Sequence, residues 1–161
     1  MDINLTNEIK SNKNYYINKD ILYIFIIFLI YIVIDYNLIV RVFQLDNKWN
    51  DFLKDIVPKE YIKDNKVEFN KIFGLLGWLS VSIGLYYFIY KSERINSIYD
   101  ILFYSIIFTI VVYGTFDFTL LAIMPNYTYT LALYDMLNGL LSITLTISAI
   151  YILKNIELKF K

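Results

Sequence analysis

Four long apolar runs constrain the fold of this chain more than any other feature. They cover residues 21–40, 72–90, 101–124 and 129–153. At about 1.5 Å of rise per residue, a helix made from any of them can cross the roughly 30 Å hydrocarbon core of a bilayer. A helix also satisfies every backbone polar group internally, as lipid requires. The connections at 91–100 and 125–128 are short, so consecutive helices are expected to be antiparallel neighbours. The sequence therefore predicts an all-α fold, an integral membrane four-helix bundle.

Composition supports this class of protein and excludes several functions. Of the 161 residues, 58% are hydrophobic, and the mean hydropathy is +0.49, above the usual range for a soluble domain. The formal net charge is zero, so we expect no nucleic-acid partner. The chain has no Cys and no His, which removes disulfides, thiolate ligands and the commonest general base. We therefore predict no cofactor and no metal. Heavy use of Ile, Asn and Lys is typical of an AT-rich genome.

The polar segments divide the rest of the chain. Residues 1–20 form a polar N-terminal tail, 21–153 the four-span membrane domain and 154–161 a C-terminal tail. The loop at 41–71 contains Trp49, Phe52, Leu53 and Ile56 at helical spacing, and Pro58 ends the pattern. This amphipathic stretch predicts a short helix. It either lies on the membrane surface or caps the bundle from outside, and both interpretations remain open.

Basic residues give a weak indication of orientation. We call face A the side that would carry both termini and loop 91–100, and face B the side that would carry loop 41–71. Face A has eight Lys and Arg residues and face B has seven. By the positive-inside rule, this slight excess favours a cytoplasmic location for face A and for both termini.

Three acidic residues lie inside the predicted spans. Asp35 is five residues before Val40, Asp117 is seven before Met124, and Asp135 is six after Tyr129. All three reference positions are at face B, so the three carboxyl groups share a depth of about 8–10 Å. They come from three different helices. The topology therefore predicts that they meet at one level of the bundle.

Energetic cost predicts that these acids face inward. A charged Asp in hydrocarbon costs at least about 2.5–3.5 kcal/mol. Polar and small residues accompany the acids, as expected for a helix–helix interface. The predicted intramembrane cluster consists of Asp35, Tyr113, Thr115, Asp117, Asp135, Asn138 and Ser142. No Lys or Arg lies within a predicted span, so we expect at least one of the three carboxyl groups to be protonated or to share a proton.

Part of the sequence resembles a known family. The stretch YGTFDFT at 113–119, followed by Leu121-Ala122, resembles the YGTYDLTNLAT stretch of an uncharacterised family of four-span predicted membrane proteins (domain of unknown function 2177). Asp135 followed by Gly139 is similar to D-x-x-W-G in the last helix of that family, and Asp35 matches its first-helix Asp. This chain has Leu120 where the family usually has Asn, and Asn138 where it usually has Trp. The resemblance implies the fold and topology but no established activity.

Three classes of function remain. We favour a structural or accessory membrane protein whose acids fix helix packing, with no enzymatic activity. The second class is a transporter of protons, cations or a small solute that uses the acids. The third is a membrane-embedded enzyme with the acids as general acid and base or as ligands of a hard cation. The expected partners are the lipid bilayer and either further copies of this chain or another membrane protein.

Overall fold

The structure is a computed structural model that describes residues 2–68 and 71–159, with side chains placed for 19–68, 71–157 and 159. Within this part of the chain, four helical segments are long and apolar enough to cross a membrane. They are Lys19–Val42, Lys71–Tyr90, Ile98–Ile123 and Tyr129–Glu157. Each lies within a few residues of a predicted apolar run. The helices pack together, so the predicted all-α four-helix bundle is confirmed.

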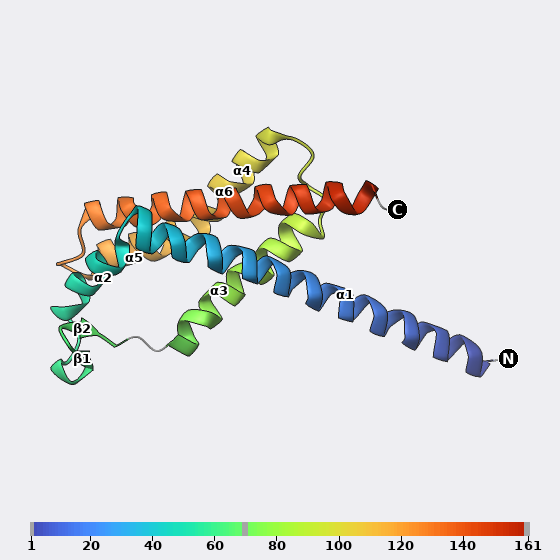
Figure 1. Cartoon of the computed structure of the whole chain (residues 1–161), viewed down its shortest axis with the longest axis horizontal. Coiled ribbons are helices and arrows are strands. Elements are labelled where there is room, and N and C mark those ends of the chain that lie inside the picture. Colours follow the sequence, from blue (N-terminus) through green and yellow to red (C-terminus); the bar gives the residue numbers. More distant parts are fainter. Residues whose placement is uncertain (1, 69–70, 160–161) are drawn as a thin grey trace.

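Most spans are made of more than one helical element (Figure 1). The first contains α1 (Asp2–Asn37) and η1 (Leu38–Val42), and the second contains α3 (Lys71–Leu85) and η3 (Tyr86–Tyr90). The third contains α4 (Ile98–Thr109), η4 (Ile110–Gly114) and α5 (Thr115–Ile123), whereas the fourth is the single helix α6 (Tyr129–Lys159). The elements η1, η3 and η4 are single π-helical turns. Such turns widen the helix locally and change which side chains face a neighbour.

Local sequence explains where the third span begins. Ser97 precedes α4, and its side chain accepts a hydrogen bond from the backbone N–H of Asp100. The Asp100 carboxylate accepts in return from the backbone N–H of Ser97, at 2.9 Å. This reciprocal pair satisfies two of the N–H groups that a helix start leaves without a partner. It fixes the end of loop 91–97 and the start of the span.

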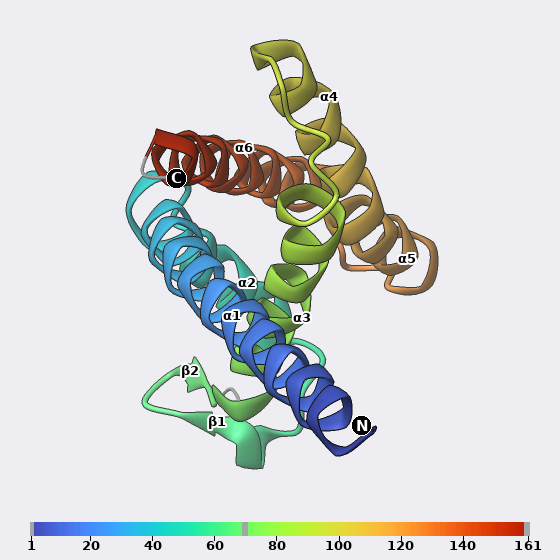
Figure 2. The ribbon, with the colours of Figure 1, turned by 90° about the vertical axis from the view of Figure 1, so that its right-hand side faces the viewer.

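Helix α6 runs beside α1 and α4 (Figures 1 and 2). It contacts α1, α2, α4 and α5. One apolar core joins α6 to the first three spans, and its fully buried members include Ile27, Leu85, Ile89, Ile143 and Ile147. Because α6 touches the other spans along its length, side chains on its inner face can reach groups on each of them.

The loop between the first two spans covers one end of the bundle. Helix α2 (Leu45–Lys54) buries Leu45 and Phe52 against Tyr127, Leu131 and Ala132. The amphipathic stretch therefore packs its apolar side on the bundle. The 3₁₀ turn η2 (Lys59–Tyr61) follows, and then strands β1 (Ile62–Lys63) and β2 (Lys66–Val67) form a hairpin that the sequence did not predict. Its two turn residues both have positive φ, as a type I′ hairpin turn requires.

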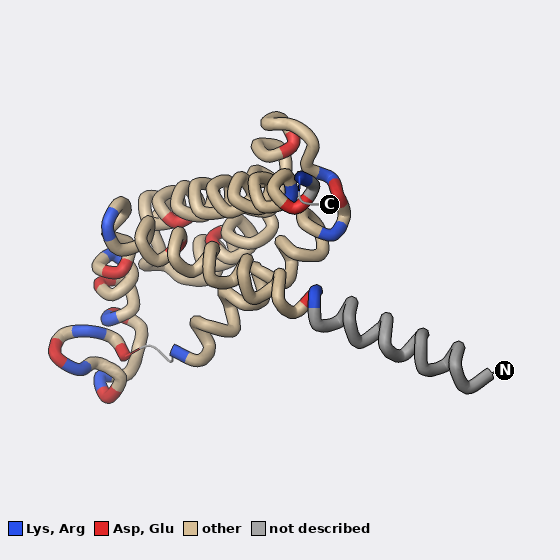
Figure 3. The backbone as a smooth tube through the Cα atoms, turned by 45° about the vertical axis from the view of Figure 1, so that its right-hand side comes forward, with Lys and Arg blue, Asp and Glu red and all other residues tan. Residues whose placement is uncertain are grey.

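Charged residues gather at the two ends of the helical body. Figure 3 shows the blue Lys and Arg positions at these ends, with only a few red acidic positions between them. The end with Lys19, Lys91 and Glu157 is face A. The end covered by α2 is face B. The acidic residues between the two ends are therefore candidate functional residues.

Candidate functional site

Asp35 accepts three hydrogen bonds in the interior of the bundle. Its side chain is 2% exposed. Trp78 Nε1 donates to Oδ2 at 2.8 Å, and Tyr113 OH and Asn138 Nδ2 each donate to Oδ1 at 3.0 Å. The three donors come from α3, η4 and α6. A single carboxyl group on the first span is thus hydrogen-bonded to each of the other three spans.

A second layer of hydroxyl groups holds Tyr113 in place. Tyr31 OH and Tyr113 OH are 2.7 Å apart. Because the Tyr113 proton points to Asp35, Tyr31 is the donor in this pair. Ser142 lies beside both tyrosine hydroxyls. The result is an ordered chain of donors that runs from Tyr31 through Tyr113 to the Asp35 carboxyl group.

Gly139 makes room for Tyr113. A Cβ atom at position 139 would lie 2.3 Å from the Tyr113 ring, much closer than any real contact. Gly139 is on α6, one residue after Asn138. The absence of a side chain there allows the ring to lie directly on the α6 backbone. Close packing and the hydrogen bonds to Asp35 therefore depend on the same small residue.

Asp117 and Asp135 lie toward the α2 end of the bundle. Asp117 is fully buried, and one of its carboxyl oxygens, Oδ1, accepts a hydrogen bond from Tyr127 OH. Its other oxygen, Oδ2, has no hydrogen-bond partner among the described residues. Asp135 is 8% exposed, lies beside Trp49, and is within electrostatic range of both Asp117 and Asp35. Asp135 is thus the electrostatic link between the other two acids, and among the described residues Asp35 is the one of the three with several donors.

Tyr127 keeps its proton in this setting. It lies in the turn between the third and fourth spans. Burial, followed by the hydrogen bond to the Asp117 carboxyl group, raises the pKa of Tyr127 above its ordinary value. The hydroxyl therefore remains a donor to Asp117 throughout the physiological pH range.

Most of the predicted site residues come together, and one does not. The carboxyl cluster, as we use the name below, comprises Asp35, Trp78, Tyr113, Asp117, Tyr127, Asp135 and Asn138, with Tyr31 and Ser142 beside it. Thr115 is exposed and stays outside it. Ser142 is buried, and its hydroxyl donates to the Gly139 carbonyl at 3.2 Å. Among the described residues, no group of three or more His, Cys, Asp and Glu side chains is placed to hold a metal ion.

Sequence reasoning missed Trp78, Tyr31 and Tyr127. A usable signal existed for Trp78, because it lies six residues after Ile72, at the same depth from face B as the three acids. A buried indole N–H also needs an acceptor. Tyr31 lies one helical turn before Asp35. Tyr127 lies outside the spans, and nothing in its sequence context indicated a bond to Asp117.

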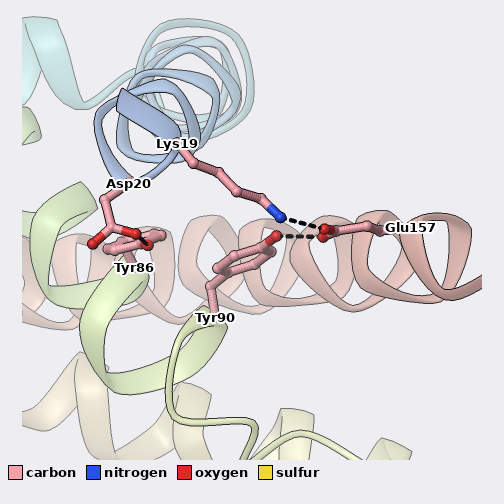
Figure 4. Close-up of polar contacts among 5 residues, drawn as sticks. All are labelled: Lys19, Asp20, Tyr86, Tyr90 and Glu157. Carbon is pink, nitrogen blue, oxygen red and sulfur yellow. Dashed lines mark hydrogen bonds and ion pairs between the residues drawn. The ribbon is translucent and has the colours of Figure 1, made fainter. Parts of the chain in front are cut away.

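A second polar group lies at face A and was not predicted. Figure 4 shows Lys19 and Tyr90 directed at Glu157, and Tyr86 directed at Asp20. Lys19 Nζ lies 2.8 Å from Glu157 Oε1, and Tyr90 OH donates to Oε2 at 2.7 Å. On the other carboxylate, Tyr86 donates to Asp20 Oδ1 and Lys91 Nζ lies 2.6 Å from Oδ2. Its hydrogen bond to Asp20 raises the pKa of Lys91.

No protein-family model, curated protein or solved structure matches this chain. Membership of the four-span family that residues 113–139 resemble therefore stays a prediction. What can be inferred about function comes from the residues of this chain alone.

Proposed function

We propose that this chain is a structural or accessory membrane protein whose carboxyl cluster holds four spans in one arrangement. The observation that supports this most is the set of three hydrogen bonds at Asp35, from Trp78, Tyr113 and Asn138. Between helices in lipid, hydrogen bonds and close packing replace the hydrophobic effect as the source of specificity. Such a role implies a partner in the bilayer, either a second copy of this chain or another membrane protein.

The energetics support a structural use of Asp35. An isolated carboxylate in an apolar interior is costly, and hydrogen bonds to the charged form offset part of that cost. The dependence is mutual, because the buried N–H and O–H donors around Asp35 need an acceptor. Loss of the acceptor leaves each donor without a hydrogen-bond partner, and each such buried donor costs about 1–3 kcal/mol.

The test is a pair of substitutions at Asp35. Asp35→Leu removes the acceptor for three donors, so we expect the free energy of unfolding in detergent to fall by at least about 3 kcal/mol. Asp35→Asn keeps one acceptor oxygen but turns its amide toward the Trp78 N–H, so a smaller loss of about 1–2 kcal/mol is expected. Asp55→Leu, at an exposed residue that follows α2, is the control. Unchanged stability of Asp35→Leu would contradict the proposal.

One observation favours proton handling as a second candidate function. The Asp117 Oδ2 atom is buried and without a described partner, and Asp135 lies close enough to interact electrostatically. A carboxyl group in this setting is a candidate proton carrier. If it carries protons, Asp117→Asn abolishes proton uptake into dye-loaded liposomes and leaves thermal stability nearly unchanged. Asp46→Asn, at an exposed residue of α2, should behave as wild type. Wild-type uptake no faster than that of empty liposomes would exclude this candidate.

We also propose that both termini face the cytoplasm. The even number of candidate spans supports a common side for the termini. The slight excess of basic residues on face A supports the cytoplasm as that side. The ion pair between Lys19 and Glu157 is consistent with this arrangement, because it joins the start of the first span to the end of the fourth.

A further inference from the structure

The polar group at face A surrounds a cavity of about 550 Å³, which we call the face A cavity. It lies between the start of the first span, the end of the second span and the end of α6. Its lining includes Lys19, Asp20, Lys91, Glu93, Lys154 and Glu157, together with four tyrosines and Ile95. Charged groups at span ends, with tyrosine rings below them, are typical of the level of lipid headgroups.

Four of the charged groups in the cavity neutralise one another. Lys19 pairs with Glu157, and Lys91 pairs with Asp20. Tyr90 and Tyr86 donate to the remaining carboxylate oxygens, so each oxygen of Glu157 and of Asp20 already accepts a hydrogen bond. Each of these carboxylates is thus already paired with one lysine and one tyrosine hydroxyl.

Lys154 and Glu93 are the charged lining residues outside these pairs. Lys154 Nζ lies 5.6 Å from the centroid of the Tyr90 ring, and no described carboxylate lies within 4.0 Å of it. Glu93 is exposed in the loop after the second span. The cavity thus offers one cation, held against an aromatic ring, and one carboxylate at the rim.

We propose that the face A cavity binds a headgroup that contains both a phosphate and a primary ammonium group. Lys154 contacts the phosphate, and Glu93 accepts hydrogen bonds from the ammonium group. Among zwitterionic lipids of a bilayer, phosphatidylethanolamine has this chemistry. Leu22 and Phe25 are exposed apolar residues of α1 within two turns of Lys19, so the first span offers apolar surface near this end for the acyl chains of such a lipid.

Native mass spectrometry of the full chain in detergent tests this proposal. Phosphatidylethanolamine, phosphatidylglycerol and phosphatidylcholine are titrated separately. A lysine near the membrane surface contributes about fivefold in affinity for a lipid phosphate. We expect Lys154→Gln to weaken phosphatidylethanolamine binding by about that factor. Lys159→Gln removes the same charge from the same helix but does not line the cavity, so it should have little effect.

Comparison of the three lipids tests whether the ammonium group is recognised. Wild-type protein should prefer phosphatidylethanolamine to phosphatidylglycerol, which lacks the ammonium group, and to phosphatidylcholine, which has no N–H donor. Glu93→Gln should remove that preference. Equal or tighter binding of either other lipid, or equal effects of Lys154→Gln and Lys159→Gln, would overturn the proposal. Competition by soluble phosphoethanolamine would show that the headgroup alone suffices, and no competition would show that the acyl chains contribute.

Discussion

Gly139 illustrates how much of this fold depends on single residues. A methyl group at this position would meet the Tyr113 ring at 2.3 Å. Gly139→Ala therefore forces Tyr113 away from α6 and weakens its hydrogen bond to Asp35. Overpacking of this kind costs about 1–3 kcal/mol. We expect a corresponding drop in the free energy of unfolding, measured in detergent by tryptophan fluorescence.

Gly77→Ala is the matched control for Gly139→Ala. A Cβ atom at Gly77 would meet nothing within 4 Å. Alanine is a better helix former than glycine, so this variant should be as stable as wild type or slightly more stable. If both variants behave alike, the close approach of Tyr113 to α6 does not limit stability.

At the same scale, depth in the membrane is easier to predict from the sequence than the direction of a side chain. Counting from span ends predicted one depth for Asp35, Asp117 and Asp135, because depth needs only the helical rise. Rotation about the helix axis is harder to predict. Thr115 is two residues from Asp117, about 200° around an α-helix, and its exposure follows from this angle. Asn138, three residues after Asp135, falls on the same face.

Among the elements, α3 is joined to the carboxyl cluster through one hydrogen bond, from Trp78 to Asp35. Its first half diverges from the bundle (Figure 1). Residues of α1 and α3 line an apolar groove of about 940 Å³ there. The indole of Trp78 crosses to Asp35 at the inner end of this groove. Trp78→Phe keeps the ring but loses the donor. We expect faster amide exchange in Lys71–Leu85, by about fivefold if the bond contributes 1 kcal/mol.

Trp49→Phe controls for the loss of an indole N–H elsewhere in the molecule. Trp49 packs on the face B end, against Tyr127 and Phe52. Its substitution should leave exchange in α3 unchanged. Equal exchange of α3 in wild type and Trp78→Phe would mean that packing, rather than the bond to Asp35, holds this helix.

The elements also show what hydrophobic periodicity cannot predict. The apolar runs predicted four helices, but not the π turns η1, η3 and η4. A lipid-facing helix is apolar on most sides, so its sequence has no distinct apolar stripe in which a change of helical period could be seen. The hairpin at 62–67 depends on two residues with positive φ, Asp64 and Asn65. The amphipathic pattern of α2 was evident from the sequence, but its partners were not, because Tyr127 and Leu131 are distant in the chain.

For the molecule as a whole, four spans would place both termini on one side of the membrane and the loop at face B on the other. The chain has no Cys, so each engineered cysteine is the only thiol in its variant. Leu5→Cys and Lys159→Cys place a thiol near each terminus, and Lys59→Cys places one in the loop at face B. We expect an impermeant maleimide to label only Lys59→Cys in intact cells, and the other two only after the membrane is permeabilised.

Labelling of positions 5 and 159 from opposite sides would contradict an even number of spans. Labelling of both, but not of position 59, in intact cells would retain four spans and reverse the orientation.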